Sequence, residues 1–191
     1  MAIKMPNKKK ERKELLETIA VPEGIEVNFD KGFLIVKGPK GENKKYLSNK
    51  KINVKINDNK ITISSKKSTK REKKIVGSFK AHIKNMLKGV KEPHRYIMKI
   101  CSGHFPMNVS VENNKFIVKN LLGEKIPRVM EVKEGVTVKV EGDNVVVESA
   151  DKEKAGQCAA SIERLTRRTG YDPRIFQDGC YIISKDEKEI K

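Results

Sequence analysis

The 191-residue sequence contains no tryptophan, few other aromatic residues and no long apolar run. A helix that crosses a bilayer needs about 20 consecutive apolar residues. No segment approaches that length, so the sequence excludes a membrane-spanning protein. Aromatic residues make up 5% of the chain, which disfavours a sheet face built for stacking bases. The basic N-terminal residues are followed by no apolar segment, and we therefore expect no secretory signal.

Cysteine is also scarce. The chain has three cysteines, Cys101, Cys158 and Cys180, which are widely spaced and include no Cys-x-x-Cys pair. An odd number with this spacing argues against both a disulfide framework and a zinc site. This cysteine usage is typical of proteins from a reducing compartment such as the cytoplasm.

The sequence carries no local signature of catalysis or cofactor binding. The histidines, His82, His94 and His104, have no partner at the spacing of metal ligands. A P-loop and a dinucleotide fingerprint are both lacking. A Cys–His nucleophilic dyad stays open, because such partners meet only in the fold. We predict that the protein is not an enzyme, and that it binds no metal, cofactor, membrane or small-molecule substrate.

Positive charge is what the chain has in excess. It carries 42 lysine and arginine residues against 25 acidic ones, for a net charge of +17 and a pI near 9.7. Residues 1–97 hold 26 basic and 10 acidic residues, a net of +16, whereas residues 98–191 hold 16 and 15, a net of +1. Such a charge attracts polyanions. The alternative is a solvated, lysine-rich surface without a partner.

The order of predicted elements occurs twice, which indicates an internal duplication. Residues 25–37 and 52–64 alternate apolar and polar side chains around turn residues, as β-hairpins do. Residues 109–118 and 136–148 repeat this pattern in the second half. Residues 97–101 predict a further strand at the start of that half.

A helix is predicted to close each half. Apolar residues three or four apart predict one over residues 76–90, with a stop at Gly89. Asp151 is a suitable N-cap for the second helix. Its inward residues would be Ala155, Cys158 or Ala159, Ile162 and Leu165, and its opposite face Gln157, Ser161, Arg164 and Arg168.

We therefore predict an α+β fold with an internal duplication, in which two similar small domains each pack antiparallel β-hairpins on one α-helix. The predicted domains are residues 21–93 and 94–191, the second ending in a basic loop and tail. Residues 1–20 form a basic extension, of which residues 6–17 would be a tail or a short helix.

The segment Gly38-Pro-Lys-Gly41 has the Gly-x-x-Gly form with which KH domains clamp nucleic-acid backbones. In those domains the loop joins two helices, whereas here predicted strands flank it. A glycine-permitted turn between strands is the stronger interpretation. It would expose Lys37, Lys40, Lys44 and Lys45 to phosphates.

Residues 164–174 predict an irregular basic segment after the second helix. Arginine binds phosphate with two parallel hydrogen bonds, and a tyrosine can stack on an unpaired base. Cations at the end of a helix also complement its dipole, but this would account for only Arg167 and Arg168. We expect this segment to bind RNA backbone and shape rather than sequence.

Several motifs, in order along the chain, resemble a known family. They are residues 36–42 (VKGPKGE), 85–90 (NMLKGV), 95–96 (RY), 104–109 (HFPMNV) and 120–125 (NLLGEK). Together they resemble the universal large-subunit ribosomal protein six family, whose eukaryotic members are called large-subunit protein nine. The likeness covers about residues 20–184. Residues 159–160 (AA) and 175–181 (IFQDGCY) resemble the eukaryotic branch.

The resemblance implies a duplicated α+β protein of the large, 60S-type ribosomal subunit. Such a protein binds large-subunit ribosomal RNA near the stalk base and the sarcin–ricin loop, contacts neighbouring ribosomal proteins and has translational GTPases nearby. It implies a cytoplasmic location on the ribosome, with nuclear or nucleolar assembly if the source is eukaryotic. The alternative is a free basic nucleic-acid-binding protein or RNA chaperone.

The predicted RNA-binding residues come from both halves. Those of the second half are Arg164, Arg167, Arg168, Tyr171 and Arg174, to which the family's pattern of RNA contacts maps. Those of the first half and its border are Lys37, Lys40, Lys44, Lys45, Lys66, Lys67, Lys70, Arg71, Lys73, Lys74 and Arg95. We expect specific anchoring from the arginines and diffuse attraction from the lysines.

Overall fold

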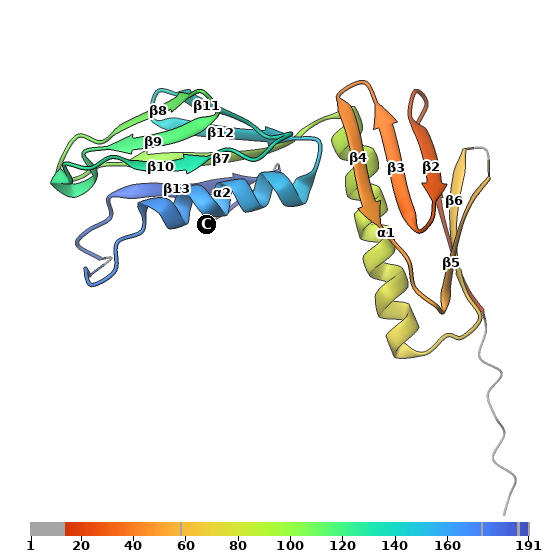
Figure 1. The fold of residues 1–191 in the computed structure, drawn as a ribbon. Helices are drawn as coiled ribbons and strands as arrows, with labels where there is room; N and C mark the ends of the chain where they lie inside the picture. Colours follow the sequence, from red (N-terminus) through yellow and green to blue (C-terminus); the bar gives the residue numbers. More distant parts are fainter. Residues whose placement is uncertain (1–13, 58, 173, 187, 191) are drawn as a thin grey trace, which may run out of the picture.

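The chain folds into two halves that join near Pro93, each with antiparallel sheets and one long helix (Figure 1). This computed structural model describes residues 14–57, 59–172, 174–186 and 188–190. Within these residues, no helix is long and apolar enough to cross a membrane.

The first half contains two three-stranded sheets and helix α1. Its elements are β1 (Leu15–Ala20), β2 (Glu26–Asp30), β3 (Phe33–Gly38), β4 (Gly41–Tyr46), β5 (Ile52–Asn57), β6 (Lys60–Ser65) and α1 (Lys70–Lys91). The strand orders are β2-β3-β4 and β1-β6-β5. Alternation along β6 turns Ile61 and Ile63 inward, where both are fully buried in one cluster with Val76, Ile83 and Val90 of α1.

The second half repeats this plan with a larger sheet. Its elements are β7 (His94–Cys101), β8 (Asn108–Glu112), β9 (Lys115–Lys119), the 3-10 turn η1 (Leu121–Gly123), β10 (Arg128–Glu131), β11 (Thr137–Glu141), β12 (Asn144–Ser149), α2 (Lys152–Thr166), β13 (Gly179–Lys185) and β14 (Lys188–Glu189). The strand orders are β10-β9-β8 and β11-β12-β7-β13-β14. Phe116, Met98 and Ile162 are fully buried in its core.

The α+β class and the internal duplication are confirmed, as are the predicted hairpins. Asn113 and Asn114, between β8 and β9, both have positive φ, 46° and 62°, as a two-residue hairpin turn requires. Gly38 and Gly41 end one strand and begin the next, so this segment is the predicted strand-to-strand turn and not a KH loop. The two hydrophobic clusters lie on either side of Pro93, which supports our proposed domain boundary at residues 93/94.

The prediction overlooked β1, β4, β10, β13 and β14. Strand β4 reads GENKKY, and its one buried side chain is the polar Asn43, so its sequence carries no apolar alternation. Its strand conformation comes from pairing with β3. Strand β13 pairs with β7, about 80 residues earlier in the chain. Its Tyr-Ile-Ile run is rich in strand-forming residues, a local signal that the prediction did not use.

The predicted helix stop at Gly89 is wrong, because α1 continues to Lys91. Gly89 is needed for close packing: a Cβ there would overlap the carbonyl oxygen of Ala150. The helix also begins earlier than its apolar stripe, at Lys70 after the N-cap Thr69. The cations of residues 70–74 therefore lie in its first turns.

Helix α2 confirms the predicted N-cap: the amide of Glu153 donates to Oδ1 of Asp151 at 2.9 Å. Ala155, Cys158, Ala159 and Ile162 are buried as expected. Arg168 is not on the helical face that we predicted, because α2 ends at Thr166.

The predicted tail or short helix at residues 6–17 is wrong for Leu15–Glu17, which belong to β1. The sequence LLETIA does not alternate apolar and polar residues, and the alternate exposure of its side chains arises from pairing with β6. Residues 6–13 lie outside the described part of the chain.

The two halves meet through a small polar joint. Asn43 Nδ2 donates to the carbonyl of Ala150 at 3.3 Å. Lys45 of β4 contacts Glu153 of α2, and its Nζ lies 3.1 Å from Nδ1 of His82. His94, fully buried, lies between the carbonyl of Asn85 and the carboxylate of Asp186.

Candidate nucleic-acid interface

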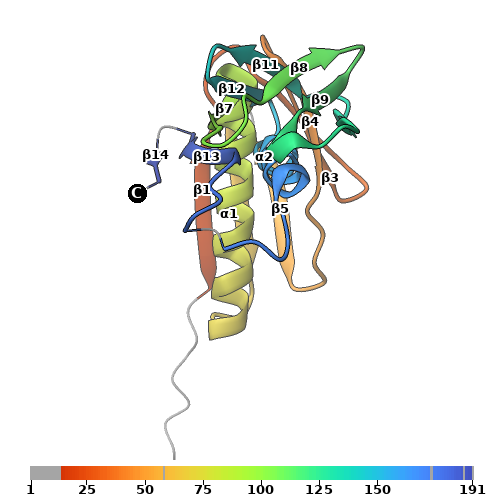
Figure 2. The same cartoon turned by 90° about the vertical axis from the view of Figure 1, so that its left-hand side faces the viewer.

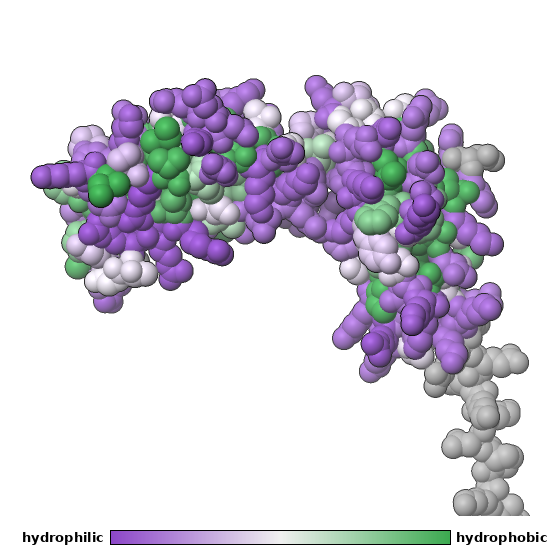
Figure 3. Space-filling view, viewed as in Figure 1, coloured by the Kyte–Doolittle hydropathy of each residue, from purple (hydrophilic) through white to green (hydrophobic). Residues whose placement is uncertain are grey.

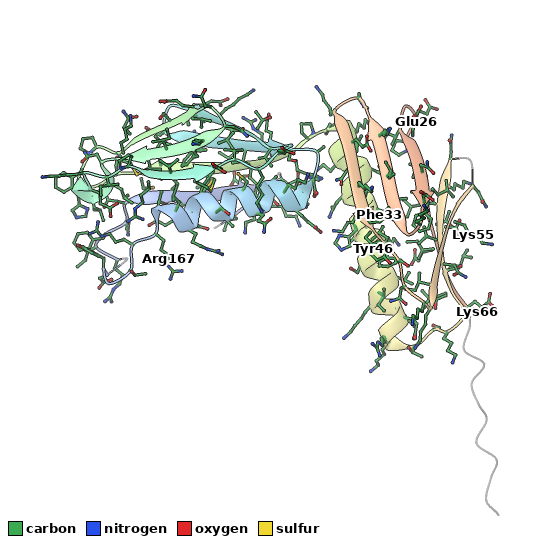
Figure 4. All side chains as sticks on the ribbon, in the orientation of Figure 1. Glu26, Phe33, Tyr46, Lys55, Lys66 and Arg167 are labelled. Carbon is green, nitrogen blue, oxygen red and sulfur yellow. The ribbon has the colours of Figure 1, made fainter. Side chains whose placement is uncertain are left out.

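An irregular basic loop follows α2 and returns to the sheet at β13. It spans residues 167–178 and lies at the end of the second half that is remote from the first half (Figure 1). Arg167 projects from this region (Figure 4). The amide of Cys180 donates to Oγ1 of Thr166 at 3.0 Å, so the two ends of the loop are tied together in the core.

Glu124 holds two arginines at the start of the loop. Its carboxylate accepts two hydrogen bonds from Arg128, at 2.8 and 2.7 Å, and one from Nη1 of Arg168 at 2.7 Å. The hydrogen bond from Arg128 is the main reason that the pKa of Glu124 lies below its ordinary value. Paired forks of this kind restrict orientation as well as adding energy.

Arg128 also caps the C-terminus of α2. Its Nη1 donates to the carbonyls of Leu165 at 2.6 Å and Arg167 at 3.1 Å. These carbonyls belong to the end of a helix, where the last acceptors have no helical partner and the dipole is negative. The Arg128 guanidinium therefore fixes the direction in which the chain leaves α2.

An aromatic stack supports the middle of the loop. His104 lies against Phe176 with ring centroids 4.8 Å apart, and Tyr171 meets Phe176 edge-on at 4.8 Å. The Arg168 guanidinium lies 4.7 Å over the ring of Tyr171. One face of this ring is thus covered by Arg168, and the side chain is 42% exposed. Tyr171 therefore supports Arg168, while the predicted stacking on a base stays a prediction.

Asp178 anchors the far end of the loop. Its carboxylate accepts hydrogen bonds from the amides of Gly103 and His104, at 2.8 and 3.0 Å, and from Nδ1 of His104 at 2.6 Å. Burial alone would raise the pKa of Asp178. The hydrogen bonds from His104 and Gly103 outweigh burial and hold the pKa below its ordinary value.

A groove of about 710 Å³ runs between the end of α2 and the loop. Arg164 and Arg167 line it and are exposed. Within the described residues, neither guanidinium has an ion pair or a hydrogen bond. Arg174 differs, because its guanidinium pairs with Asp172 at 2.9 Å while remaining exposed. The groove therefore presents two unpaired arginines on a braced support.

A second basic region surrounds the start of α1. Lys66, Lys67, Lys70, Arg71, Lys73 and Lys74 are all exposed there, and Lys66 lies at the lower end of the first half in Figure 4. Cations at a helix N-terminus oppose the helix dipole. On the face seen in Figure 3, the surface of both halves is mostly hydrophilic, with small apolar patches between.

The remaining predicted residues are scattered. Lys37 pairs with Glu42 at 3.6 Å and Arg95 lies 3.6 Å from Glu148, while Lys40 is exposed in the β3–β4 turn. Lys44 lies over the ring of Phe33 at 4.7 Å. Lys45 belongs to the joint between the halves and not to an open surface.

The three thiols are buried to different degrees. Cys158 and Cys180 are buried, and Cys101 is partly buried. Burial raises the pKa of Cys180 to about 12, which keeps its thiol protonated. In the described part of the chain, no three His, Cys, Asp or Glu side chains gather as metal ligands.

Sequence reasoning missed the residues that brace the loop. The only local signal of the Glu124–Arg128 ion pair is that the two residues are four positions apart in the sequence. His104, Phe176 and Asp178 come together from segments more than 70 residues apart, so nothing in the local sequence indicates their contact.

The chain is similar to known proteins over most of its length. A family model described as ribosomal protein L6 matches residues 21–93 and 105–179. The large ribosomal subunit protein uL6 of Methanococcoides burtonii is 43% identical over 173 residues, which cover 91% of this chain and 98% of that protein. The uL6 protein of Nanoarchaeum equitans is 43% identical over 180 residues, covering 90% and 94%. Since the family model matches both halves and these relatives align almost from end to end, the chain belongs to the ribosomal protein L6 family.

Proposed function

We propose that this protein is a structural constituent of the large, 60S-type ribosomal subunit and binds its ribosomal RNA. The proposal is supported by membership of the L6 family and by relatives that are named as large-subunit proteins. It has a supporting role in translation and no catalytic one. Its position is on the ribosome near the stalk base and the sarcin–ricin loop, beside other ribosomal proteins and within reach of translational GTPases.

One observation carries the proposal: the braced groove at the end of α2 presents Arg164 and Arg167 unpaired. A guanidinium that already has a carboxylate partner must break that ion pair before it binds phosphate. The guanidiniums of Arg164 and Arg167 have no ion pair to break. Their support is rigid because Glu124, Arg128 and Arg168 fix the loop from one side and Asp178 from the other. Fixed, planar donors match the geometry of phosphate oxygens.

The cations around the start of α1 supply a second, less specific contact. They lie at the positive end of the helix dipole, where only one acidic residue, Glu72, lies in the first turn. Phosphate at this end would relieve the repulsion among these side chains. Because they are lysine-rich and exposed, we assign them diffuse attraction and the arginine groove specific anchoring.

Incorporation into large subunits tests the proposal. Charge reversal of Arg164 and Arg167 to glutamate should abolish retention of the protein on subunits through a moderate salt wash. Reversal of Lys66, Lys67 and Lys70 should weaken retention less. The matched control reverses Lys55 and Lys139, which are exposed and belong to neither region.

Binding to fragments of ribosomal RNA gives an independent measurement. Each neutralised phosphate should contribute about 0.7 to 0.9 to the log–log dependence of affinity on salt. A salt-insensitive affinity would contradict the proposal. A wild-type protein that washes off subunits together with all variants would instead support a free nucleic-acid-binding protein.

A further inference from the structure

Strand β1 leaves one edge of its sheet open. The strand order β1-β6-β5 puts β1 at the border, and its only ladder in the described residues is with β6. The amide of Val21 donates to the carbonyl of Asn59 at 2.8 Å, which extends this ladder by one pair. Because bonded and non-bonded pairs alternate in antiparallel ladders, Glu17 and Ile19 bond to β6. The amides and carbonyls of Leu16, Thr18 and Ala20 therefore point outward.

Helix α1 lies beside this open edge. Figure 2 shows β1 running alongside α1 over much of the helix. Between them is the β1–α1 groove, of about 620 Å³, whose lining includes Thr18, Ile19 and Ala20 from the strand and Leu87 from the helix. Four lysines line the helix side of the groove: Lys80, Lys84, Lys88 and Lys91. Lys84 and Lys91 are exposed.

We propose that the β1–α1 groove binds an extended acidic segment of another protein, which adds to β1 as a further strand and faces the lysines of α1. An added strand would satisfy the three outward amides and carbonyls of β1, as in known strand additions. Its alternate side chains would point toward α1, where the charge is positive.

The spacing of the two elements matches. Residues four apart on a helix are separated by about 6 Å along its axis, at 1.5 Å per residue. Residues two apart in a strand are separated by about 6.7 Å. Acidic residues at alternate positions of the added strand would therefore match the spacing of Lys80, Lys84 and Lys88, of which Lys80 already pairs with Glu17 and Lys88 lies 3.6 Å from Asp186.

The chain already contains one contact of the proposed kind. Glu17, on the α1-facing side of β1, accepts a hydrogen bond from Nζ of Lys80 at 2.6 Å. A carboxylate on a strand at this edge thus reaches a lysine on the helix.

Charge argues against the other occupants. A second copy pairing through β1 would bring two lysine-rich helices together. The chain's own residues 1–13 carry six basic residues against one acidic residue, so they would be repelled by the lysines of α1. An RNA phosphate group would fit the lysines, but phosphate only accepts hydrogen bonds and would face the outward carbonyls of β1 unfavourably. A polypeptide offers both donors and acceptors.

A synthetic peptide tests the proposal on the full chain. The probe is a fluorescent peptide of about ten residues, a typical strand length, in which glutamate alternates with threonine. Binding is followed by fluorescence anisotropy. Backbone hydrogen exchange should then show new protection at Leu16, Thr18 and Ala20, and little change at Glu17 and Ile19.

Two protein variants probe the two sides of the groove. Thr18→Pro removes an outward amide but no bond to β6, and proline is tolerated at strand edges. Charge reversal of Lys84 and Lys91 to glutamate removes the electrostatic match. Each should weaken binding about tenfold, equivalent to about 1.4 kcal/mol. Reversal of Lys55 and Lys139 is the matched control and should leave the affinity nearly unchanged.

Two peptide controls need no change to the protein. A peptide N-methylated at alternate amides cannot extend a sheet, and an isomer with its glutamates in one block lacks the alternate spacing. Either one binding as tightly as the probe would overturn the proposal. So would protection of the β1 edge by self-association without peptide, or an RNA hairpin that competes equally well and is insensitive to Thr18→Pro. None of these variants touches the arginine groove, so a failure here is distinguishable from a failure of the proposed RNA binding.

Discussion

The imidazole Nδ1 of His94 lies 3.0 Å from the carboxylate Oδ2 of Asp186, at the joint between the two halves. The other ring nitrogen lies 2.9 Å from the carbonyl of Asn85 in α1. Lys152 of α2 lies 3.3 Å from the same carboxylate of Asp186. One acidic residue near the C-terminus therefore connects β7 and both helices.

Replacement of Asp186 should weaken this joint. Asp186→Asn keeps the shape but removes the carboxylate that lies 3.0 Å from the fully buried His94 and is the counter-charge of the Lys152 ammonium. We expect a loss of about 2 kcal/mol in the free energy of unfolding at pH 7, since breaking a largely buried pair exposes an uncompensated group. Urea unfolding measures it. Glu189→Gln, on exposed β14, is the control, and equal effects of the two changes would rule out the role assigned to Asp186.

Acid should destabilise the fold through specific carboxylates. For both Asp178 and Asp186, burial would raise the pKa, but hydrogen bonds and charges, chiefly from His104 and His94, outweigh it and lower the pKa. A folded pKa below the unfolded one gives stability that is present above the unfolded pKa, about 3.9. That stability is lost as pH falls through the folded pKa.

Melting temperature measured against pH checks this expectation. The wild type should lose stability progressively below about pH 4. Asp178→Asn should start from a lower melting temperature and show a shallower fall over the same range. An unchanged slope in that variant would show that Asp178 does not contribute to the acid transition.

Glu124 offers a test that separates positioning from charge. Glu124→Gln removes a negative charge beside the proposed RNA groove, so simple electrostatics predicts tighter RNA binding. Because Glu124 orients Arg128 and Arg168, we expect the opposite, with affinity for ribosomal RNA about fivefold weaker. Hydrogen exchange over residues 164–178 should also become faster.

Glu163→Gln is the matched control for this change. Glu163 lines the same groove, and its carboxylate has no ion pair in the described residues. Its replacement should leave RNA affinity unchanged or slightly higher. If both variants strengthened binding equally, Glu124 would act through its charge alone.

Two glycines of α1 should respond oppositely to alanine. Gly89→Ala would force a methyl group against the carbonyl of Ala150, and we expect a loss of about 2 kcal/mol, as overpacking causes. A Cβ at Gly77, in the same helix, would meet nothing within 4 Å. Gly77→Ala should therefore stabilise the protein by about 0.5–1 kcal/mol, the helix-propensity difference. Thermal unfolding of the two variants makes the comparison, and a stabilising effect of Gly89→Ala would contradict the packing role.

Local patterns predicted much of the fold. The hairpins with alternating apolar residues, the apolar stripe of α1 and the cap at Asp151 were all readable, because each depends on residues within a few positions of one another. Strand β4 was not, since its pairing with β3 rather than its own side chains determines its conformation. The end of α1 was misplaced because Gly89 is not a helix stop. It is a glycine because the backbone packs closely against Ala150, about 60 residues later.

The candidate site was predictable in composition but not in arrangement. Arg164 and Arg167 are exposed and unpaired, whereas Arg168 is committed to Glu124 and Lys45 to the joint. A count of cations cannot separate these cases. The difference depends on whether a carboxylate from a distant segment is within hydrogen-bonding distance.

Composition, periodicity and motifs were enough to show that this protein is basic, duplicated, of α+β class and similar to a ribosomal family, because they are local properties of the chain. The folded chain was needed to show which arginines are unpaired, which histidine is buried beside an acid and which strand edge lies open beside a row of lysines. Those properties depend on contacts between segments far apart in the chain, where burial and pairing decide the energy of each charge.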